Sequence, residues 1–82
     1  MPTLRALRES NYISRRKLAE NAGVSESTII RMERGEKRTT EEVIKSVLEA
    51  LGDMVNKKFT MADVEGINVY DPMRDRKYPI RK

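Results

Sequence analysis

The 82-residue chain contains no cysteine, no histidine and no tryptophan. These absences exclude disulfides, thiolate chemistry, zinc sites of the usual kind and acid–base catalysis by imidazole. Aromatic residues make up only 5% of the chain, so the core must be built from Leu, Ile, Val, Ala and Met. Long apolar runs are also missing: no uncharged stretch exceeds five residues, whereas a membrane span needs about 20 apolar residues. A secretory signal needs an apolar region too, so we expect a soluble, cytoplasmic protein with no membrane partner.

Charged residues are abundant: they make up 37% of the chain, and the net charge is +4. Residues 14–38 carry seven cations and four anions, residues 39–66 three cations and six anions, and residues 67–82 five cations and two anions. A basic–acidic–basic pattern suits a protein that turns one face toward a polyanion. A charge run taken alone is equally typical of a solvated surface.

The most informative stretch predicts two short helices joined by one tight turn. Leu18 marks the inner face of the first helix and Ile29 that of the second. Gly23 stands where a helix must stop in a left-handed conformation, and Ser25 then caps the second helix. This is the pattern of a DNA-reading helix-turn-helix, whose second helix, here residues 26–34, enters the major groove.

Further helices are expected on both sides of this motif. A first helix is predicted over residues 3–10, with Asn11 able to adopt the left-handed stop. A capping box from Thr39 to Glu42 predicts the start of a fourth helix, and Gly52 is expected to end it.

The signal weakens after this fourth helix. A further short helix is expected in the segment 59–64, where Thr60 caps and Asp63 occupies the capping-box position. Residues 67–82 contain two prolines and no helical period, so they are predicted to form a short strand or hairpin or to be disordered. The sequence therefore predicts an all-α bundle of four or five helices over residues 1–66, with a basic, non-helical tail over residues 67–82.

The helix expected at 26–34 carries the side chains best suited to reading bases. Ile30 can pack on thymine methyls, and Arg31 can bind guanine O6 and N7 through two hydrogen bonds. Glu26 can accept from cytosine N4, and Ser27 can serve a base or a phosphate. The bland alternative is an ordinary amphipathic helix with one exposed isoleucine.

The helix before it begins with Arg15, Arg16 and Lys17, where the positive end of the helix dipole disfavours cations by a few tenths of a kcal/mol each. Cations that stand at an unfavourable helix position often mark a functional site. Three cations beside free N–H groups favour phosphate binding. The alternative is that Arg and Lys are merely good helix formers. The full set of predicted DNA-binding residues is Arg15, Arg16, Lys17, Ser25, Glu26, Ser27, Thr28, Ile30, Arg31, Arg34, Lys37 and Arg38.

Arg8 and Glu33 lie on helices whose neighbouring positions face inward, so we expect them to form a structural ion pair.

An enzymatic role has little support. Ser14-x-x-Lys17 matches the string of serine acylases, but that chemistry needs further motifs and a large pocket, and Ser14 is better explained as a helix cap. We therefore expect no catalytic residues, no metal and no cofactor.

Residues 4–52 resemble the Cro/repressor-type (Xre-like, lambda-repressor-like) helix-turn-helix family of phage and bacterial regulators. The resemblance is carried by the series Leu4-Arg5…Arg8, Ser14…Leu18-Ala19-Glu20…Ala22-Gly23-Val24-Ser25, Thr28-Ile29…Met32-Glu33-Arg34-Gly35 and Leu51-Gly52. It implies a compact helical bundle that binds double-stranded DNA as a homodimer on a palindromic operator. It also implies that Arg15, Glu26, Ser27 and Arg31 occupy contact positions, and that Arg8 and Glu33 form the family's internal ion pair.

The chain departs from the family pattern at three places. Arg15 stands where the family usually has Gln. Tyr12 stands where the family usually has Gly, and we expect Asn11 to adopt the special turn conformation in its place. A polar insert over residues 53–58 precedes the fifth helix, which in the family often makes the dimer contact.

We interpret the chain as a sequence-specific transcriptional regulator, in the first place a repressor. One alternative is an antitoxin that regulates its own operon, with residues 67–82 binding a partner protein. Another is a protein-interaction module that reuses the fold without DNA. A fragment of a longer regulator also fits the sequence. The tail itself is predicted to add a strand to a second protomer or to follow a minor groove.

Overall fold

The computed structural model describes residues 2–70. Four α-helices occupy most of this range: α1 (Leu4–Ser10), α2 (Arg15–Ala22), α3 (Glu26–Glu33) and α4 (Glu41–Val55). A 3₁₀ turn, η1 (Met61–Asp63), follows α4, and two short strands, β1 (Thr39–Thr40) and β2 (Val69–Tyr70), pair with each other. The helical bundle with a non-helical end that the sequence predicts is confirmed.

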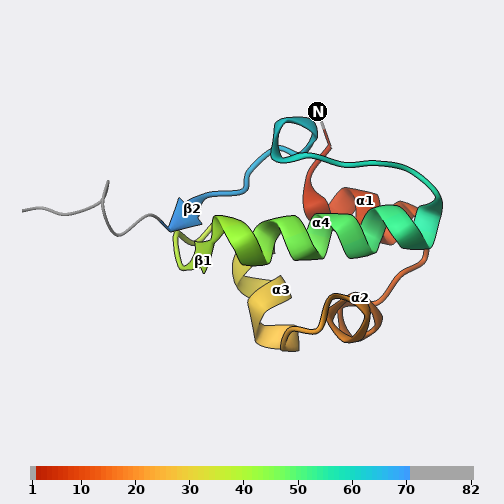
Figure 1. Cartoon of the computed structure of the whole chain (residues 1–82), viewed down its shortest axis with the longest axis horizontal. Helices are drawn as coiled ribbons and strands as arrows, with labels where there is room; N and C mark the ends of the chain where they lie inside the picture. Colours follow the sequence, from red (N-terminus) through yellow and green to blue (C-terminus); the bar gives the residue numbers. More distant parts are fainter. Residues whose placement is uncertain (1, 71–82) are drawn as a thin grey trace, which may run out of the picture.

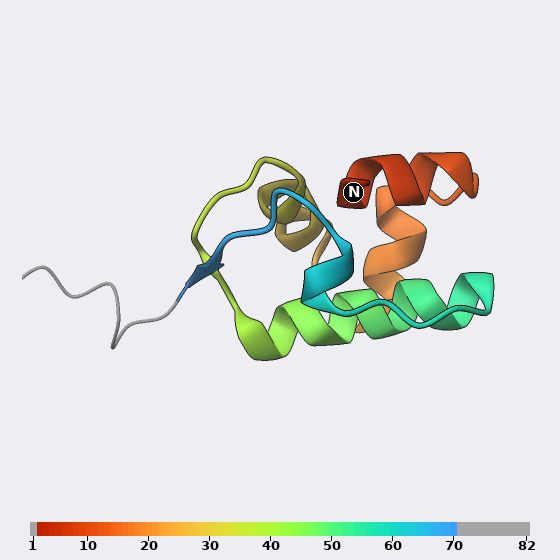
Figure 2. The same cartoon turned by 90° about the horizontal axis from the view of Figure 1, so that it is seen from above.

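The longest helix, α4, is the axis around which the other elements are arranged. It lies along the long direction of the molecule, with α2 and α3 on one side of it (Figure 1). After α4 the chain turns back over residues 57–60 and runs beside the helix in the opposite direction (Figure 2). The helices thus form a cluster around α4, and the chain that follows α4 packs along this helix (Figure 2).

The core is aliphatic, as the scarcity of aromatic residues requires. Its largest fully buried side chains come from all four helices, and they are Leu4, Leu18, Ile29, Ile44, Val47, Leu48 and Leu51. Burying a side chain of this size contributes about 1.5–3 kcal/mol, so this cluster accounts for much of the stability of the fold.

The turn between α2 and α3 follows the predicted chemistry closely. Gly23 adopts a left-handed conformation (φ +73°), and the N–H of Val24 bonds back to the carbonyl of Ala19 at 3.0 Å. Ser25 then caps α3 through its side-chain oxygen, which accepts from the N–H of Thr28. The geometry of this turn fixes the angle at which α3 leaves the body of the domain.

The turn between α1 and α2 differs from expectation. Tyr12, not Asn11, takes the left-handed conformation, with φ +59° against −106° for Asn11. The N–H groups of Tyr12 and Ile13 bond to the carbonyls of Glu9 and Arg8, which is the helix ending usually made with glycine. Asn11 is held elsewhere, because its side-chain amide donates to the carbonyl of Leu7 at 2.8 Å. The prediction that Asn11 replaces the missing glycine is therefore wrong.

Both expected ends of α4 are also wrong. Thr40 rather than Thr39 caps the helix, since its side chain accepts from the N–H of Val43, and Thr39 is buried in β1. The helix continues past Gly52 to Val55 and ends at Asn56, which is left-handed (φ +63°). Gly52 is needed for space: a Cβ there would collide with the carbonyl of Lys57, where the returning chain crosses the helix.

The expected short helix after the insert is a single 3₁₀ turn. The Asp63 carboxylate accepts hydrogen bonds from the N–H (2.8 Å) and the hydroxyl (3.0 Å) of Thr60, so the expected capping pair is present. These two bonds, the backbone one foremost, hold the pKa of Asp63 below its usual value.

Residues 67–70 belong to the folded body of the domain. β2 pairs in parallel with β1, with Val69 opposite Thr39 and Tyr70 opposite Thr40. Ile67 and Val69 are half-buried against the core, so their apolar side chains are partly covered by this chain itself. The rest of the predicted tail, 71–82, lies outside the described residues, and the division at residue 66 stays a prediction.

Candidate nucleic-acid interface

The outer face of α3 begins with two polar residues that make no interaction within residues 2–70. Glu26 and Ser27 are exposed in the first turn of the helix, and neither side chain has a hydrogen-bond or ion-pair partner in that range. The side chains of Ser25 and Thr28, by contrast, bond to each other at 3.1 Å as part of the helix cap. The first turn of α3 therefore offers one carboxylate and one hydroxyl for contact with another molecule.

The next turn of the same face carries Ile30 and Arg31, and both are half-buried. The guanidinium of Arg31 lies 3.4 Å from the hydroxyl of Thr28, a long contact that leaves most of its donors available. Arg34 caps the helix end, is exposed, and lies 3.6 Å from Glu36. The isoleucine expected on the outer face is thus partly covered. Of the two arginines, Arg34 is exposed, while Arg31 is half-buried and has donors left over.

The amino-terminal turn of α2 presents cations beside free backbone N–H groups. Ser14 caps the helix by accepting from the N–H of Lys17 at 3.0 Å. The side chain of Arg16 is 80% exposed and meets Glu20 only at 3.6 Å. Exposed ion pairs of this kind contribute little to stability. Arg16 and Lys17 are therefore available to an anion.

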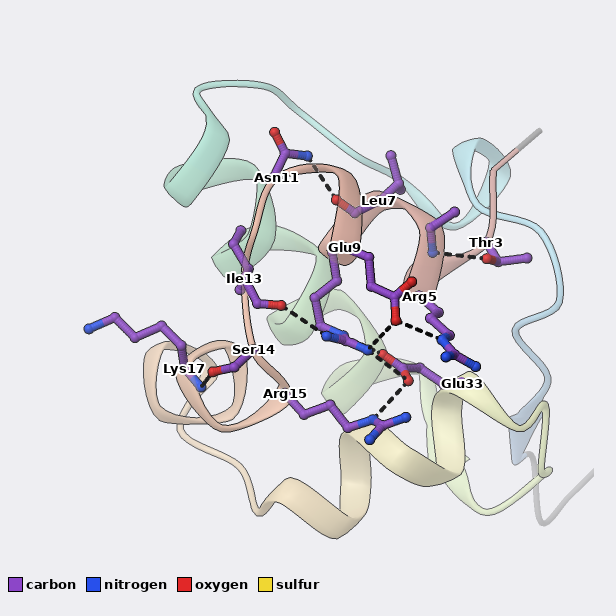
Figure 3. Close-up of polar contacts among 12 residues, drawn as sticks. Thr3, Arg5, Leu7, Glu9, Asn11, Ile13, Ser14, Arg15, Lys17 and Glu33 are labelled. Carbon is purple, nitrogen blue, oxygen red and sulfur yellow. Dashed lines mark hydrogen bonds and ion pairs between the residues drawn. The ribbon is translucent and has the colours of Figure 1, made fainter.

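Arg15 is placed differently from its two neighbours. Its Nε donates to Oε1 of Glu33 at 3.0 Å, and its side chain is 39% exposed (Figure 3). The dipole argument treats this arginine as an unfavourable cation whose presence a bound phosphate would explain. In the structure it has an intramolecular partner, so part of the explanation lies within the fold. The contact of Arg15 with Glu33, the carboxylate already expected to pair with Arg8, is what sequence reasoning missed.

The same carboxylate receives Arg8, as expected. Arg8 Nε lies 2.7 Å from Glu33 Oε2, and Arg8 Nη1 donates to the carbonyl of Ile13 at 2.9 Å. The side chains of both partners are buried, with 8% and 5% of their surfaces exposed. This pair joins α1 to α3, and removal of one partner would leave a buried charge uncompensated.

The network continues outward from Arg8 along α1. Glu9 lies 3.7 Å from Arg8 and accepts a 2.8 Å hydrogen bond from Nε of Arg5 (Figure 3). That bond raises the pKa of Arg5 and lowers the pKa of Glu9. The charges along this network alternate in sign, and its two ends are arginines, Arg5 with 62% and Arg15 with 39% of the side chain exposed.

Two further predicted contact residues lie in the loop after α3. Lys37 and Arg38 are both exposed there, and Arg38 lies 3.8 Å from Glu36. Taken together, the predicted residues come from three consecutive segments: the start of α2, the whole of α3 and the loop beyond it.

No group of acidic residues in the described part of the chain has metal-binding geometry. None of the described helices is long and apolar enough to cross a bilayer.

Comparison with known proteins identifies this arrangement. A family model described as a helix-turn-helix domain matches residues 3–52, which cover α1 to α3 and most of α4. The chain belongs to this Cro/Xre-like helix-turn-helix family, whose members bind DNA and regulate transcription. Neither the curated proteins nor the solved structures give a significant match.

Proposed function

We propose that the protein is a sequence-specific repressor that binds a palindromic operator as a homodimer. In this proposal α3 lies in the major groove and reads bases with Glu26, Ser27, Ile30 and Arg31. The observation that carries the proposal is the first turn of α3, where Glu26 and Ser27 are exposed and have no partner within residues 2–70. The amino end of a helix is the part of a helix-turn-helix that reaches base edges.

The cations around α3 supply the sequence-independent part of binding. Arg16 and Lys17 at the start of α2, and Arg38 beyond α3, are exposed on segments that flank the reading helix. Such residues neutralise phosphates and release counterions, so affinity falls steeply with salt. Phosphate contacts also fix the register in which α3 meets the bases.

Selection of bound sequences from random duplex DNA tests this function directly. We expect a preferred site made of two inverted half-sites one helical turn apart, about 10–10.5 base pairs from centre to centre. An asymmetric site would contradict the homodimer. Uniform recovery of all sequences would contradict specific reading by α3.

A titration against salt separates this function from a protein-interaction module. Binding through several phosphates should weaken by orders of magnitude between 50 and 200 mM salt, since the logarithm of the affinity falls with a slope of about −0.9 per neutralised phosphate. Binding to a protein partner that survives this step unchanged, without measurable DNA binding, would favour the module.

A further inference from the structure

Arg15 has donors left over after its contact with Glu33. The contact uses Nε alone, and the two terminal nitrogens, Nη1 and Nη2, have no partner within residues 2–70. A guanidinium carries five N–H donors in a fixed plane, so fixing Nε also fixes the direction of the other four. Arg15 therefore presents an oriented pair of nitrogens at the amino end of α2.

The charges of the network do not balance: Arg5, Arg8 and Arg15 carry three positive charges, and Glu9 and Glu33 carry two negative ones. Glu33 is the one carboxylate between Arg8 and Arg15, and its two oxygens already accept from both arginines (Figure 3). Arg8 is fully engaged, because each of its three nitrogens has a partner on Glu33 or Ile13. One positive charge of the network is thus left over. Because Arg5 is paired with Glu9 and Arg8 is fully engaged, Arg15, which shares Glu33 with Arg8, is the arginine whose charge an anion would complete.

We propose that Glu33 is a positioning residue, which holds Arg15 through Nε so that its terminal nitrogens bind a DNA phosphate. The inference rests on the proposed function, and it adds that phosphate binding by α2 is coupled to base reading by α3. Glu33 lies on α3, so the carboxylate that orients the phosphate contact belongs to the same helix that meets the bases. Phosphate binding at α2 and base reading by α3 are then linked through one side chain.

The substitution Arg15→Lys tests the geometry while keeping the charge. A lysine has one nitrogen on a flexible chain, so it cannot hold the carboxylate and the phosphate in the fixed fork of a guanidinium. We expect operator affinity to fall about tenfold, the effect of about one charge-assisted hydrogen bond, with the salt slope unchanged. Arg5→Lys is the matched control, because Arg5 is also exposed and also held by a carboxylate through Nε, but lies on α1 outside the proposed interface; we expect less than about a twofold change. Equal effects of the two substitutions would overturn the inference.

The role of Glu33 is tested by a double-mutant cycle with Arg15→Gln. Arg15→Gln alone should weaken binding and reduce the salt slope by about 0.9 per domain. Glu33→Gln should weaken binding when Arg15 is present and have no further effect when Gln occupies position 15. Equal losses in both backgrounds would show that Glu33 acts through the fold alone and would overturn the proposal.

Glu33→Gln also lowers stability, because Arg8 keeps its buried charge without a carboxylate. Binding is therefore measured at a temperature where circular dichroism shows each variant folded. Val47→Ala serves as the stability control, since Val47 is fully buried in the core and lies on α4; we expect it to lower the melting temperature but to leave DNA affinity unchanged. If the unmodified protein binds no duplex, the proposed function fails together with the inference. If it binds with a steep salt slope and Arg15→Lys has no effect, the inference alone fails.

Discussion

The side-chain amide of Asn68 donates a 2.6 Å hydrogen bond to the main-chain carbonyl of Gly35, just beyond the end of α3. Gly35 is left-handed (φ +75°), and a Cβ on it would lie 3.2 Å from the carbonyl oxygen of Gly66. The segment that follows η1 is therefore in close contact with the carboxyl end of the helix proposed to read DNA.

This contact predicts a stabilising role for a residue far from the motif in sequence. Asn68→Ala should lower the free energy of unfolding by about 1 kcal/mol, the net contribution of one hydrogen bond. Asn21→Ala is the control: its amide donates to the carbonyl of Lys17 within α2 and makes a long, weak contact with the sulfur of Met54 at 3.5 Å, and the loss is offset by the higher helix propensity of alanine. Urea denaturation of both variants measures the difference. Equal stabilities would contradict a role for Asn68 in holding the end of α3.

The left-handed tyrosine at the end of α1 makes a second prediction. A non-glycine residue in this conformation costs about 1–2 kcal/mol, which exceeds the extra unfolded-state entropy of glycine. The Tyr12 side chain is 96% exposed, so its removal loses little packing. Tyr12→Gly should raise the free energy of unfolding by about 0.5–1 kcal/mol. Asn11→Gly should lower it, because Asn11 has an ordinary φ and bonds to Leu7. The opposite order in thermal melts would refute the assignment.

Two adjacent threonines should respond in opposite ways to the same substitution. The Thr39 hydroxyl is buried without a hydrogen-bond partner among the described residues, whereas Thr40 caps α4. Thr39→Val should raise the free energy of unfolding by about 1 kcal/mol, because it removes an unsatisfied polar group. Thr40→Val should lower it by about 0.5–2 kcal/mol through loss of the cap. Chemical denaturation distinguishes them, and a loss of stability in Thr39→Val would show that its hydroxyl is satisfied.

A fourth prediction concerns base reading by α3. Arg31→Ala should cost about 1–3 kcal/mol on the preferred site and relax the preference at one base pair of each half-site. Lys17→Ala, the comparison variant at the start of α2, should weaken binding to all sequences alike and reduce the salt slope by about one. Competition assays with single-base variants of the selected site measure both effects. A uniform loss in Arg31→Ala would assign this arginine to the phosphate backbone.

The sequence predicts best those parts of the fold that rest on local chemistry. Ser14, Gly23 and Ser25 determine the ends of α2 and the start of α3 through their own backbone and side-chain bonds, and the structure places all three as expected. The wrong assignments have different causes: Thr39 pairs with Val69 in a distant strand, whereas the exchange of Asn11 for Tyr12 lies within one local turn. Gly52 has the usual appearance of a helix end, yet the helix runs on to Val55, and Gly52 makes room for the carbonyl of Lys57, where the chain turns back.

The same distinction applies to the candidate site. The exposed positions of α3 follow from helical periodicity, because buried Ile29 and Met32 fix the opposite face. The pairing of Arg8 with Glu33 is also found as expected. The contact of Arg15 with the same carboxylate could not be predicted, since it depends on the angle between α2 and α3. The unfavourable position of Arg15 in the first turn of α2 indicates that this cation has a partner, but it does not identify Glu33 as that partner.

The backbone pairing of Thr3 with Glu65 bears on the order in which the chain folds. It joins the two ends of the described chain, and the N–H of Glu65 bonds to the carbonyl of Pro2 at 2.8 Å. Such a contact must close a loop that contains nearly the whole domain, whereas α2 packs on both α3 and α4 over shorter separations. We therefore expect the helical cluster to form first and residues 57–70 to dock on it last. In hydrogen exchange, the amides of this last segment should open at a lower free energy than those of α4.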